Sequence, residues 1–536
     1  MEDNFSVDVL IVGAGAAGLT LAIDLARRGV SFRLIEKLET PFAGSRGKAI
    51  QPRTLEVMED LGIVNSVAAC GGPYPMQREY ADDGSTQDSP VMVHGAATPA
   101  EPYPAPVMVA QFLSEGVMRA RLAEMGKAPE FGCELTSFTQ ATDGITAQLN
   151  SKIGLETVRA RYLVGADGGR SFIRQQLGVA FPGKTLDGRG LVADMMLSGL
   201  QPDAWHRFGK GPAQVSLCPL VGTPMFQLQC TIPMEGEVDL SAQGLSALVK
   251  TRTGRDDITI HEVFWASAYN MNARLADNYR IGRAFLVGDA AHIHPPTGGQ
   301  GLNTSIQDAY NLGWKLAAVI HGAPEALLDS YEEERRPIAA EMLGLATKLL
   351  IALKAGEIKR GREVQQLDLG YPDSSLALAT AEQQRGVDAG DRAPDAPMCG
   401  AGGQAVRLFD LFKGPHWTLI GFETERSSVS PRYGLQVHSI RAARAFSSQM
   451  ESSGDSEKAA NKESRVPSCF KQDGSDPRGE QGDIIDHAKH FRHAYGLVVG
   501  DWLLVRPDGY IGAIVAAGDI AALEAYLDRV GLSKIN

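Results

Sequence analysis

The 536-residue chain is 44% hydrophobic and 22% charged, so it has the composition of a globular protein and enough length for two or three domains. A net charge of −12 at pH 7, without a basic run, argues against binding to nucleic acid or to an anionic membrane surface. The longest apolar stretch, residues 9–23, is rich in glycine and runs into Asp24, which is typical neither of a signal peptide nor of a membrane span. We therefore expect a cytoplasmic protein with no nucleic-acid and no membrane partner.

The first predicted elements are a strand, a helix and a second strand. Residues 7–12 and 30–35 are short apolar runs, and residues 16–28 between them have helical spacing that is stopped by Gly29. A glycine-rich turn, GAGAAG at residues 13–18, joins the first strand to the helix. This order of elements is typical of a dinucleotide-binding unit.

Each glycine of this turn has a physical reason. Gly13 permits the tight turn, Gly15 lets a pyrophosphate approach the backbone, and Gly18 lets the helix and the strand pack closely. The helix N-terminus stabilises phosphate charge, and Glu36 can accept a hydrogen bond from a ribose hydroxyl. The motif alone does not separate FAD from NAD. The dinucleotide contacts predicted here are Gly13, Gly15, Ala16, Ala17, Gly18, Glu36 and Lys37.

The pattern changes farther along the chain. Helical spacing at residues 53–61 and 111–125 is followed, from about residue 185 to residue 270, by short alternating segments that predict a sheet-rich insert. Helical, α/β-like character returns at Ile281 and continues to about Leu353. The tract that follows is rich in Gly, Asp and Pro and predicts a connection between domains.

A second strand end carries Asp167, in the segment YLVGADGGRS at residues 162–171. One interpretation is a capped helix with Arg174 at the surface. The other is a contact that a flavin pyrophosphate shares with a nicotinamide cofactor, to which Asp167 and Arg170 would contribute. The residues alone leave both interpretations open.

A third strand end carries Asp289, in the segment GRAFLVGDAAH at residues 282–292. Ligands gather at the carboxyl ends of strands in open α/β sheets, and a carboxylate there can accept hydrogen bonds from the polyol chain of a flavin. The turn at residues 298–303 then opens a long helix, whose first amides can stabilise the negative charge of a reduced flavin. Because an NAD dehydrogenase has no use for this second acidic strand end, the motif favours FAD. The inward stripe predicted for the long helix comprises Ile306, Ala309, Tyr310, Gly313, Ala317 and Ile320.

Two histidines, His292 and His294, lie between this strand end and the helix. Their neighbours are glycines and prolines, which is typical of a loop, and they are interpreted as loop residues. No metal site is predicted.

The three motifs in this order, with Arg46 and the segment RTLE at residues 53–56, resemble the single-component FAD-dependent aromatic hydroxylases, the class A flavoprotein monooxygenases. The similarity covers roughly residues 1–350 strongly and is greatest to the branch of phenol hydroxylases and aromatic polyketide hydroxylases. It implies that NADPH or NADH reduces FAD and that one oxygen of O₂ is transferred, through a flavin C4a-hydroperoxide, to a phenolic or polycyclic, polyketide-like aromatic substrate. The nicotinamide cofactor would bind transiently, because the sequence has no second GxGxxG motif with an acidic partner.

The same resemblance implies roles for residues outside the glycine turn. Arg46 and Gln111 would contact the cofactor, although the residues alone would favour solvated side chains, and Asp289 would bind the ribityl chain. The contacts implied around the isoalloxazine ring are Pro296, Gly299, Gly301, Leu302 and Asn303.

Three residues are candidates for catalytic roles. Lys48 matches a position where some relatives carry a substrate-facing acid–base residue, and a solvated lysine is the alternative. Tyr269 lies with Trp265 on a predicted strand that could form a pocket wall, and a core aromatic is the alternative. Pro296 would border the flavin ring.

The expected fold is α/β, with a Rossmann-like FAD-binding domain of the GR2 type, a sheet-rich substrate domain and a C-terminal thioredoxin-like domain. The last is implied by resemblance, through DRAP at residues 391–394 and LVRPDGY at residues 504–510; because it lacks a CxxC motif, a structural role or support of a homodimer is expected rather than thiol chemistry. The expected domains are residues 1–74 with 105–184 and 281–353 for FAD, 75–104 with 185–280 for substrate, a linker at 354–400, and 401–536 with a mobile insertion at about 451–482.

Other functions share parts of this pattern. A Baeyer–Villiger or epoxidising oxygenase would carry every motif named above, so only its products would differ. A non-catalytic flavin-binding protein would oxidise NADPH slowly with every aromatic compound. An NAD-dependent dehydrogenase would be colourless.

Overall fold

The computed structural model describes residues 5–81, 83–92, 95–295, 299–354, 361–380, 386–443 and 483–535. The chain divides into two compact units, the first formed by residues 1–96 and 103–369 and the second by residues 97–102 and 370–536. Each unit has a hydrophobic core of its own. The insertion predicted at about 451–482 and the candidate Pro296 lie outside the described residues.

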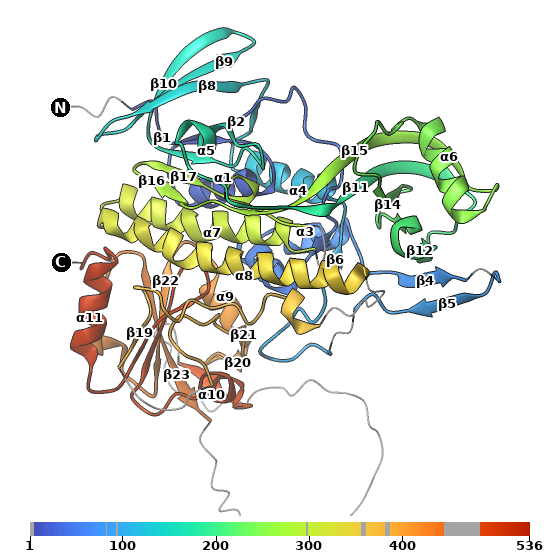
Figure 1. Cartoon of the computed structure of the whole chain (residues 1–536). Helices are drawn as coiled ribbons and strands as arrows, with labels where there is room; N and C mark the ends of the chain where they lie inside the picture. The colour runs from blue at the N-terminus through green and yellow to red at the C-terminus, as the bar shows by residue number, and fades with distance from the viewer. Residues whose placement is uncertain are drawn as a thin grey trace, which may run out of the picture. The chain divides into compact units, whose positions relative to one another are not determined.

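The first unit contains a largely parallel sheet (Figure 1). Its neighbouring strands follow the order β16, β17, β10, β1, β2 and β7. All pairs from β17 to β7 are parallel, and β9 and β8 extend the sheet from β10 by antiparallel pairing. The carboxyl ends of the parallel strands therefore share one edge. The strands are β1 (Val7–Val12), β2 (Phe32–Glu36), β7 (Glu130–Phe131), β8 (Glu134–Gln140), β9 (Ile145–Ser151), β10 (Gly154–Gly165), β16 (Arg280–Ile281) and β17 (Ala284–Leu286).

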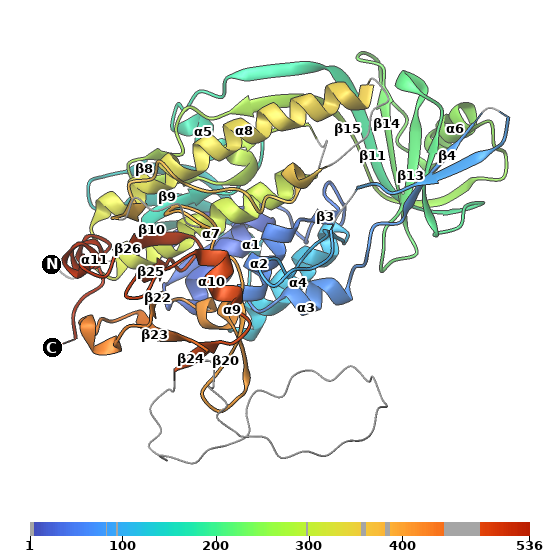
Figure 2. The ribbon, with the colours of Figure 1, turned by 90° about the horizontal axis from the view of Figure 1, so that it is seen from below.

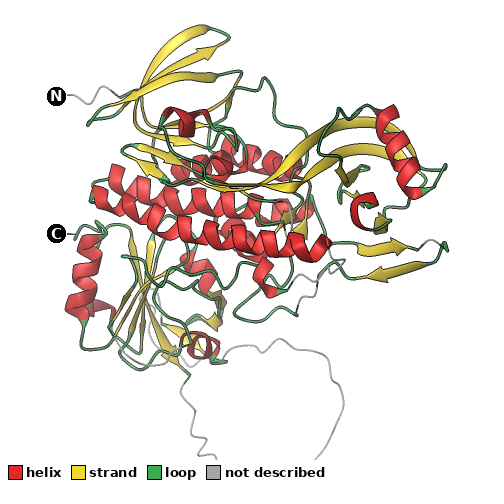
Figure 3. Cartoon of the chain, in the orientation of Figure 1, coloured by secondary structure: helices red, strands yellow, loops and turns green. Residues whose placement is uncertain are grey.

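Helices pack beside this sheet (Figure 3). Helix α1 contacts both α7 and α4, and α8 contacts α7 on another side. A two-stranded sheet of β3 (Ala49–Ile50) and β6 (Val107–Met108) lies next to α7. The helices of this unit are α1 (Ala16–Arg27), α2 (Pro52–Asp60), α3 (Val64–Ala69), α4 (Gln111–Glu124), α5 (Phe172–Gln176), α6 (Ala242–Thr253), α7 (Gly301–Ile320) and α8 (Asp329–Lys354).

Helix α7 is buried more widely than a single apolar stripe predicts. Of the predicted stripe, Ile320 is only half-buried, whereas polar residues on the other faces, such as Asp308 and Lys315, are fully buried. The reason is that α8 covers the polar side of α7, where Glu334 and Arg335 pair with those polar residues. A stripe pattern cannot report burial that depends on charge pairing between helices.

A second, mostly antiparallel sheet also belongs to the first unit (Figure 2). Its strand order is β18, β15, β11, β14, β13, β12, β4 and β5. One face is apolar: Leu191, Leu217 and Leu228 pack there with Leu245 and Val249 of α6. The strands are β4 (Met76–Tyr80), β5 (Thr86–Ser89), β11 (Gly183–Ser198), β12 (Ala204–Phe208), β13 (Val215–Pro219), β14 (Phe226–Ile232), β15 (Thr259–Leu275) and β18 (His292–Ile293).

The opposite face of this sheet, called the polar face below, is lined by polar and aromatic side chains. The strand register places these residues on one side, because directly paired residues of neighbouring strands point to the same face. The polar and aromatic residues of this face are Gln77, Glu79, Asp194, Trp205, Arg207, Ser216, Gln227, Gln229, Trp265, Ser267 and Tyr269, and Val192 and Cys218 lie on the same side. Hydrophobic residues cover the other side, so the sheet is amphipathic.

The second unit is built on a third sheet, with the order β19, β26, β25, β22, β23, β24, β20 and β21. Residues 370–400, which the sequence predicts as part of a linker, supply β19 and β20 to this sheet, because strands of two or three residues leave no periodic signal. The elements are β19 (Leu378–Ala379), β20 (Pro397–Cys399), β21 (Ala405–Arg407), β22 (Trp417–Phe422), β23 (Leu435–Ala442), β24 (Ile484–Asp486), β25 (Trp502–Val505), β26 (Ile511–Val515), α9 (Leu408–Phe412), α10 (His490–Tyr495) and α11 (Ile520–Arg529).

The expected mixed α/β fold is confirmed. Among the described helices, none combines the length and the apolar composition that crossing a bilayer requires.

Candidate active site

Four predicted site segments meet at the carboxyl edge of the first sheet. Strand β10 pairs with β1 on one side and β17 on the other, so Gly13, Asp167 and Asp289 follow three adjacent strands, and Glu36 ends β2 next to β1. Two strand spacings, about 10 Å, separate the ends of β1 and β17. Residues some 270 positions apart in the sequence therefore converge on one edge.

The glycine turn is shaped as the motif predicts. Gly13 has φ of +106°, and a Cβ there would lie 2.3 Å from the carbonyl oxygen of Ala166. A Cβ on Gly18 would lie 1.9 Å from the carbonyl oxygen of Gly13, so helix and strand touch through backbone atoms. Gly15 differs: the nearest atom to its Cβ position is Glu115 Oε1 at 3.9 Å. The protein leaves open space at Gly15, which suits the approach of a phosphate to the helix terminus.

The start of α1 can accept that phosphate. No side chain caps the helix at Gly15, so its first amides are not consumed by a capping side chain. At the end of β2, Glu36 accepts hydrogen bonds from the backbone N–H groups of Ala14 and Leu38, both at 3.0 Å. Its carboxylate thus lies beside the turn, and the neighbouring Lys37 is exposed.

The turn after β10 is held by hydrogen bonds that neither sequence interpretation predicts. Asp167 Oδ2 accepts the N–H of Ile173 at 3.1 Å, and Arg170 is exposed. Arg174 is not a surface residue: it is buried and donates to the carbonyl oxygens of Gly169 at 2.9 Å and Ala290 at 2.8 Å. Arg174 therefore ties the Asp167 turn to the Asp289 turn. The sequence alone gives no signal for this tie, because its two ends are 116 residues apart.

The Asp289 turn lies between α1 and α7. Gly288 has φ of +59°, and a Cβ there would lie 2.8 Å from Cβ of Ser305 and 3.4 Å from Cβ of Ala17. Asp289 itself is exposed at the sheet edge. An exposed carboxylate at this edge is free of steric obstruction and can accept hydrogen bonds from a bound polyol.

A buried ionic cluster holds this turn in place. Asp308 of α7 accepts the N–H of Gly288 at 3.2 Å, pairs with His292 at 2.6 Å and with Arg335 at 2.8 Å. Burial raises the pKa of Asp308, but the charges of His292 and Arg335 outweigh burial and hold the pKa below its ordinary value. His292, predicted as a loop residue, instead lies in β18 and is buried. His294 Nδ1 contacts the carbonyl oxygen of Pro295 at 2.8 Å.

The turn that opens α7 is held by Asn303. Its Oδ1 accepts the N–H of Gln51 at 2.8 Å, and its Nδ2 donates to the carbonyl oxygens of Ala49 at 2.9 Å and Gly299 at 2.8 Å. The side chain is fully buried, so it fixes backbone rather than facing an open site. Gly299 has φ of +66°, and Gly301 and Leu302 begin the helix.

Residues 42–48, called the arginine loop below, lie between β2 and β3 in the sequence and contact the second sheet. Arg46 lies over the rings of Phe42 and Trp265, at 5.0 and 5.9 Å from their centroids. The N–H of Gly47 donates to Gln111 Oε1 at 3.1 Å, and Gln111 Nε2 donates to Glu115 at 2.8 Å. Gln111, predicted as a cofactor contact, therefore also holds the arginine loop.

Glu115 is a site residue that the sequence does not single out. Its buried carboxylate accepts a hydrogen bond from the side-chain amide of Gln111 and lies beside the start of α1. Burial raises its pKa, and it lies 3.9 Å from the Cβ position of Gly15. The signal that could have found it is its spacing of one helical turn from Gln111 on α4.

Lys48 is buried, which removes the alternative of a solvated lysine. Its Nζ lies 4.1 Å from the ring centroid of Trp205 on the polar face, at cation–π distance. The fully buried Asp194 is close enough for the charge of Lys48 to act on it. Burial is the main influence on Asp194 and raises its pKa.

Tyr269 also belongs to the polar face. Its ring packs on Gly190, where a Cβ would lie 2.6 Å from the ring, and burial raises the pKa of its hydroxyl to about 12. The phenol therefore stays protonated at neutral pH and can only donate or accept hydrogen bonds.

Glu130, Cys133 and Glu156 form the one group of potential metal ligands among the described residues. Arg33 pairs with both carboxylates, at 2.5 and 2.7 Å, so the positive charge that a metal would bring is already present.

Several known proteins are similar to this chain in sequence. A flavin-dependent monooxygenase of Mycobacteroides abscessus is 43% identical over 430 residues, which cover 79% of this chain and 90% of the relative. A 6-methylpretetramide 4-monooxygenase of Streptomyces rimosus is 31% identical, over 98% of this chain and 93% of the relative. The FAD binding domain family matches residues 6–346. The chain belongs to the FAD-dependent aromatic monooxygenases.

A solved structure extends the likeness to the whole fold of this monooxygenase. The ternary complex of aklavinone-11 hydroxylase with FAD and aklavinone matches with a TM-score of 0.78 and 26% identity, over 98% of this chain and 99% of that one. The residues at the carboxyl edge fit FAD: the space at Gly15, the uncapped start of α1 and the exposed carboxylate of Asp289 are suited to its pyrophosphate and ribityl groups.

Proposed function

We propose that this monooxygenase hydroxylates a phenolic or polycyclic, polyketide-like aromatic substrate, with NADPH or NADH as reductant and O₂ as co-substrate. The observation that carries the proposal is the polar face, whose aromatic and hydrogen-bonding side chains meet the flavin-binding edge through the arginine loop. Flat aromatic rings stack on tryptophan, and substituent oxygens need buried donors and acceptors. The polar face offers both.

The residues that would hold FAD are those of the carboxyl edge. The start of α1 would stabilise the pyrophosphate, Glu36 would accept from the ribose, and Asp289 from the ribityl chain. Bound FAD supplies the redox and oxygen-transfer chemistry. The nicotinamide cofactor would bind transiently, since the sequence offers no second dinucleotide motif.

Lys48 would act on the substrate rather than on the flavin. Its buried ammonium can stabilise the oxyanion of a phenol, which makes the ring more electron-rich at the carbon that receives oxygen. Tyr269, on the same face, would orient a substituent by hydrogen bonding.

We also propose that the second unit is thioredoxin-like and structural. Support comes from its central strand order β26, β25, β22 and β23, in which β22 and β23 are parallel and the β25–β26 hairpin runs against β22. The homodimer and the cytoplasmic location stay predictions.

The decisive experiment combines NAD(P)H oxidation with product analysis. Purified holoenzyme is offered a panel of phenols and polycyclic quinones under labelled O₂. We expect one or more of them to accelerate NAD(P)H oxidation and to gain one labelled oxygen as a ring hydroxyl.

Lys48→Met should raise KM for a phenolic substrate about tenfold or more, because a charge-assisted contact is lost, without lowering FAD content. Lys250→Met, which removes an exposed lysine of α6, is the matched control.

Other products would assign other functions. A lactone or an epoxide carrying the label would indicate a Baeyer–Villiger or epoxidising oxygenase. Slow NAD(P)H oxidation that no aromatic compound accelerates, with no labelled product, would contradict the proposal and indicate a flavin-binding protein without catalysis.

A further inference from the structure

The arginine loop is held by the polar face through the backbone of Ser45. Its carbonyl oxygen accepts from Gln227 Nε2, and Ser45 lies close enough to Asp194 to counteract part of the rise that burial causes in the pKa of that carboxyl. Gln227 Nε2 also lies 3.1 Å from Asp194 Oδ1, and its Oε1 accepts from Gln229 at 2.8 Å. Ser45, Asp194 and Gln227 are all fully buried. The backbone carbonyl of one loop residue is thus held by Gln227 of β14, which Asp194 of β11 holds in turn.

The residues on either side of Ser45 rest on aromatic rings of the same face. A Cβ on Gly44 would lie 2.4 Å from Cδ2 of Trp265, so the loop backbone touches that ring directly. Arg46, the residue after Ser45, lies over the ring of the same tryptophan. The loop therefore has one position relative to the polar face, and the contacts of Ser45 set it.

The next residue of the loop is tied to the dinucleotide end of the molecule. Gly47 donates to Gln111, Gln111 donates to Glu115, and Glu115 Oε1 lies 3.9 Å from the Cβ position of Gly15, at the start of α1. A Cβ on Gly47 would lie 3.3 Å from Leu302, in the first turn of α7. Two residues beyond Ser45 in sequence, the loop is thus connected to both helix termini that would hold FAD.

We propose that Asp194, a residue of the substrate-facing sheet, is a positioning residue for FAD that acts through Ser45 and the arginine loop. The inference rests on the proposed function in one respect, namely that the polar face is where the substrate binds. Because Lys48 belongs to the arginine loop and lies over Trp205 of that face, a substrate that contacts Lys48 would act on the loop that Asp194 holds, and the affinities for substrate and FAD would be coupled.

The test measures the FAD dissociation constant of apoprotein by the change in flavin fluorescence on binding. Asp194→Leu removes the acceptor that holds Gln227 Nε2 beside the Ser45 carbonyl, and we expect the dissociation constant to rise about tenfold or more. Asp194→Asn keeps an acceptor oxygen and should give a smaller rise. Gln227→Met leaves Asp194 intact and releases only the Ser45 carbonyl, so it should weaken FAD binding as well.

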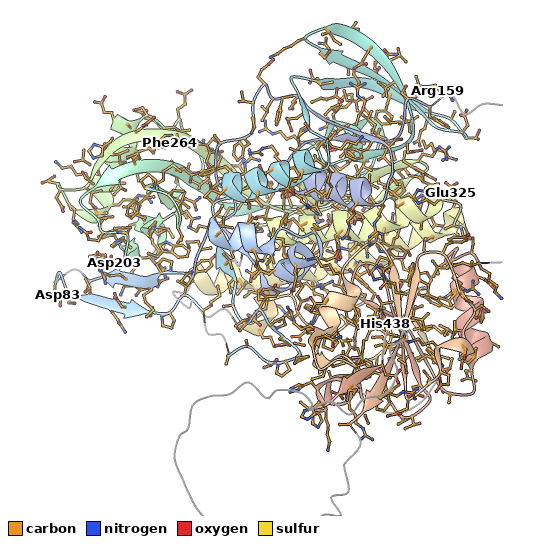
Figure 4. All side chains as sticks on the ribbon, turned by 180° about the vertical axis from the view of Figure 1, so that it is seen from behind. Asp83, Arg159, Asp203, Phe264, Glu325 and His438 are labelled. Carbon is orange, nitrogen blue, oxygen red and sulfur yellow. The ribbon has the colours of Figure 1, made fainter. Side chains whose placement is uncertain are left out.

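The matched control is Asp203→Asn. Asp203 is an exposed carboxylate just before β12 of the same sheet (Figure 4), and it pairs with Arg78. It should leave the FAD dissociation constant unchanged. The far-ultraviolet circular dichroism of each apoprotein checks that it is folded.

A second measurement separates positioning from general damage. An aromatic compound that the wild type hydroxylates should change the FAD dissociation constant of the wild type and have little effect on that of Asp194→Leu. If a folded Asp194→Asn or Gln227→Met bound FAD as the wild type does, the inference would be wrong and the proposed function would stand. If the wild type itself took up no FAD, the proposed function would fail.

Discussion

At the scale of single residues, the two carboxylates of the dinucleotide edge are in different situations. Glu36 already accepts two backbone N–H groups, so part of its role is to shape the glycine turn. Asp289 is exposed, and no hydrogen bond to its side chain is formed within the described part of the chain. Removing Asp289 should therefore affect the cofactor and leave the fold intact.

We predict that Asp289→Ala lowers the FAD content of purified protein and raises the FAD dissociation constant about tenfold or more, because a charged acceptor of a ribityl hydroxyl is lost. The ratio of visible to ultraviolet absorbance measures the content, and fluorescence titration the affinity. Asp277→Ala, which removes another exposed carboxylate nearby in the sequence, is the control. Full flavin content in Asp289→Ala would show that another group binds the ribityl chain.

The residue scale also shows where sequence reasoning ends. The glycine turn and Asp289 were predictable because each lies in a local pattern whose geometry follows from the strand before it. The burial of Lys48, and the backbone contacts of Asn303 and Gln111, were not predictable, because their partners are distant in sequence: Asn303 binds Gln51 across 252 residues, and Gln111 binds Gly47 across 64. Glu115 was missed for the same reason, since the glycine turn beside which it lies is distant in sequence.

At the scale of elements, α7 is the centre of the first unit. It lies between α1 and α8, and its buried residues Asp308, Asn311 and Lys315 pair with side chains of α8. Of these residues, Asp308 reaches the turn that carries Asp289, through the N–H of Gly288. The orientation of a sheet-edge carboxylate therefore depends on an ionic cluster between two helices.

We predict that Asp308→Asn lowers the free energy of unfolding of the first unit by about 3–5 kcal/mol, because the buried Arg335 loses the charge of the carboxylate with which it pairs. Urea denaturation followed by tryptophan fluorescence measures the change. The control is Asp329, an exposed residue of α8 that pairs with Arg280 of β16. Asp329→Asn should lower the free energy of unfolding by less than about 1 kcal/mol.

The ionic-strength dependence provides a further check on Asp308. A buried pair is screened little by salt, so the difference between Asp308→Asn and the wild type should persist at high salt, whereas any effect of Asp329→Asn should disappear. An Asp308→Asn protein as stable as the wild type would contradict the view that this cluster holds α7 and the Asp289 turn together.

Element by element, periodicity located the strand–helix–strand start and the sheet-rich insert, since long runs of apolar alternation are local signals. It did not reveal that residues 370–400 contribute to the third sheet, nor that polar residues of α7 are buried, because both depend on tertiary pairing. The amphipathic character of the second sheet follows only from the register, which no single strand contains.

At the scale of the whole molecule, the two units have separate cores, and we expect FAD to affect the stability of one unit and pH that of the other. All residues proposed to hold FAD belong to the first unit. The second unit contains His438 of β23, which is buried and whose pKa is lowered by burial, and by the nearby Arg426 and His416, from 6.5 to about 4 (Figure 4). Separate cores predict two unfolding transitions, each responding to its own perturbation.

We predict that FAD shifts only the transition of the first unit. At a free FAD concentration of 100 times the dissociation constant, the native state of that unit gains about 2.7 kcal/mol, and its midpoint in differential scanning calorimetry rises, while the other midpoint stays fixed.

A fall in pH should instead lower the stability of the second unit. Unfolded His438 binds a proton near pH 6.5 and the folded residue only near pH 4, so the second unit loses stability as pH falls through this interval. His438→Phe should remove much of that loss without changing the FAD-dependent shift. A single transition that moves with both FAD and acid would show that the units unfold together.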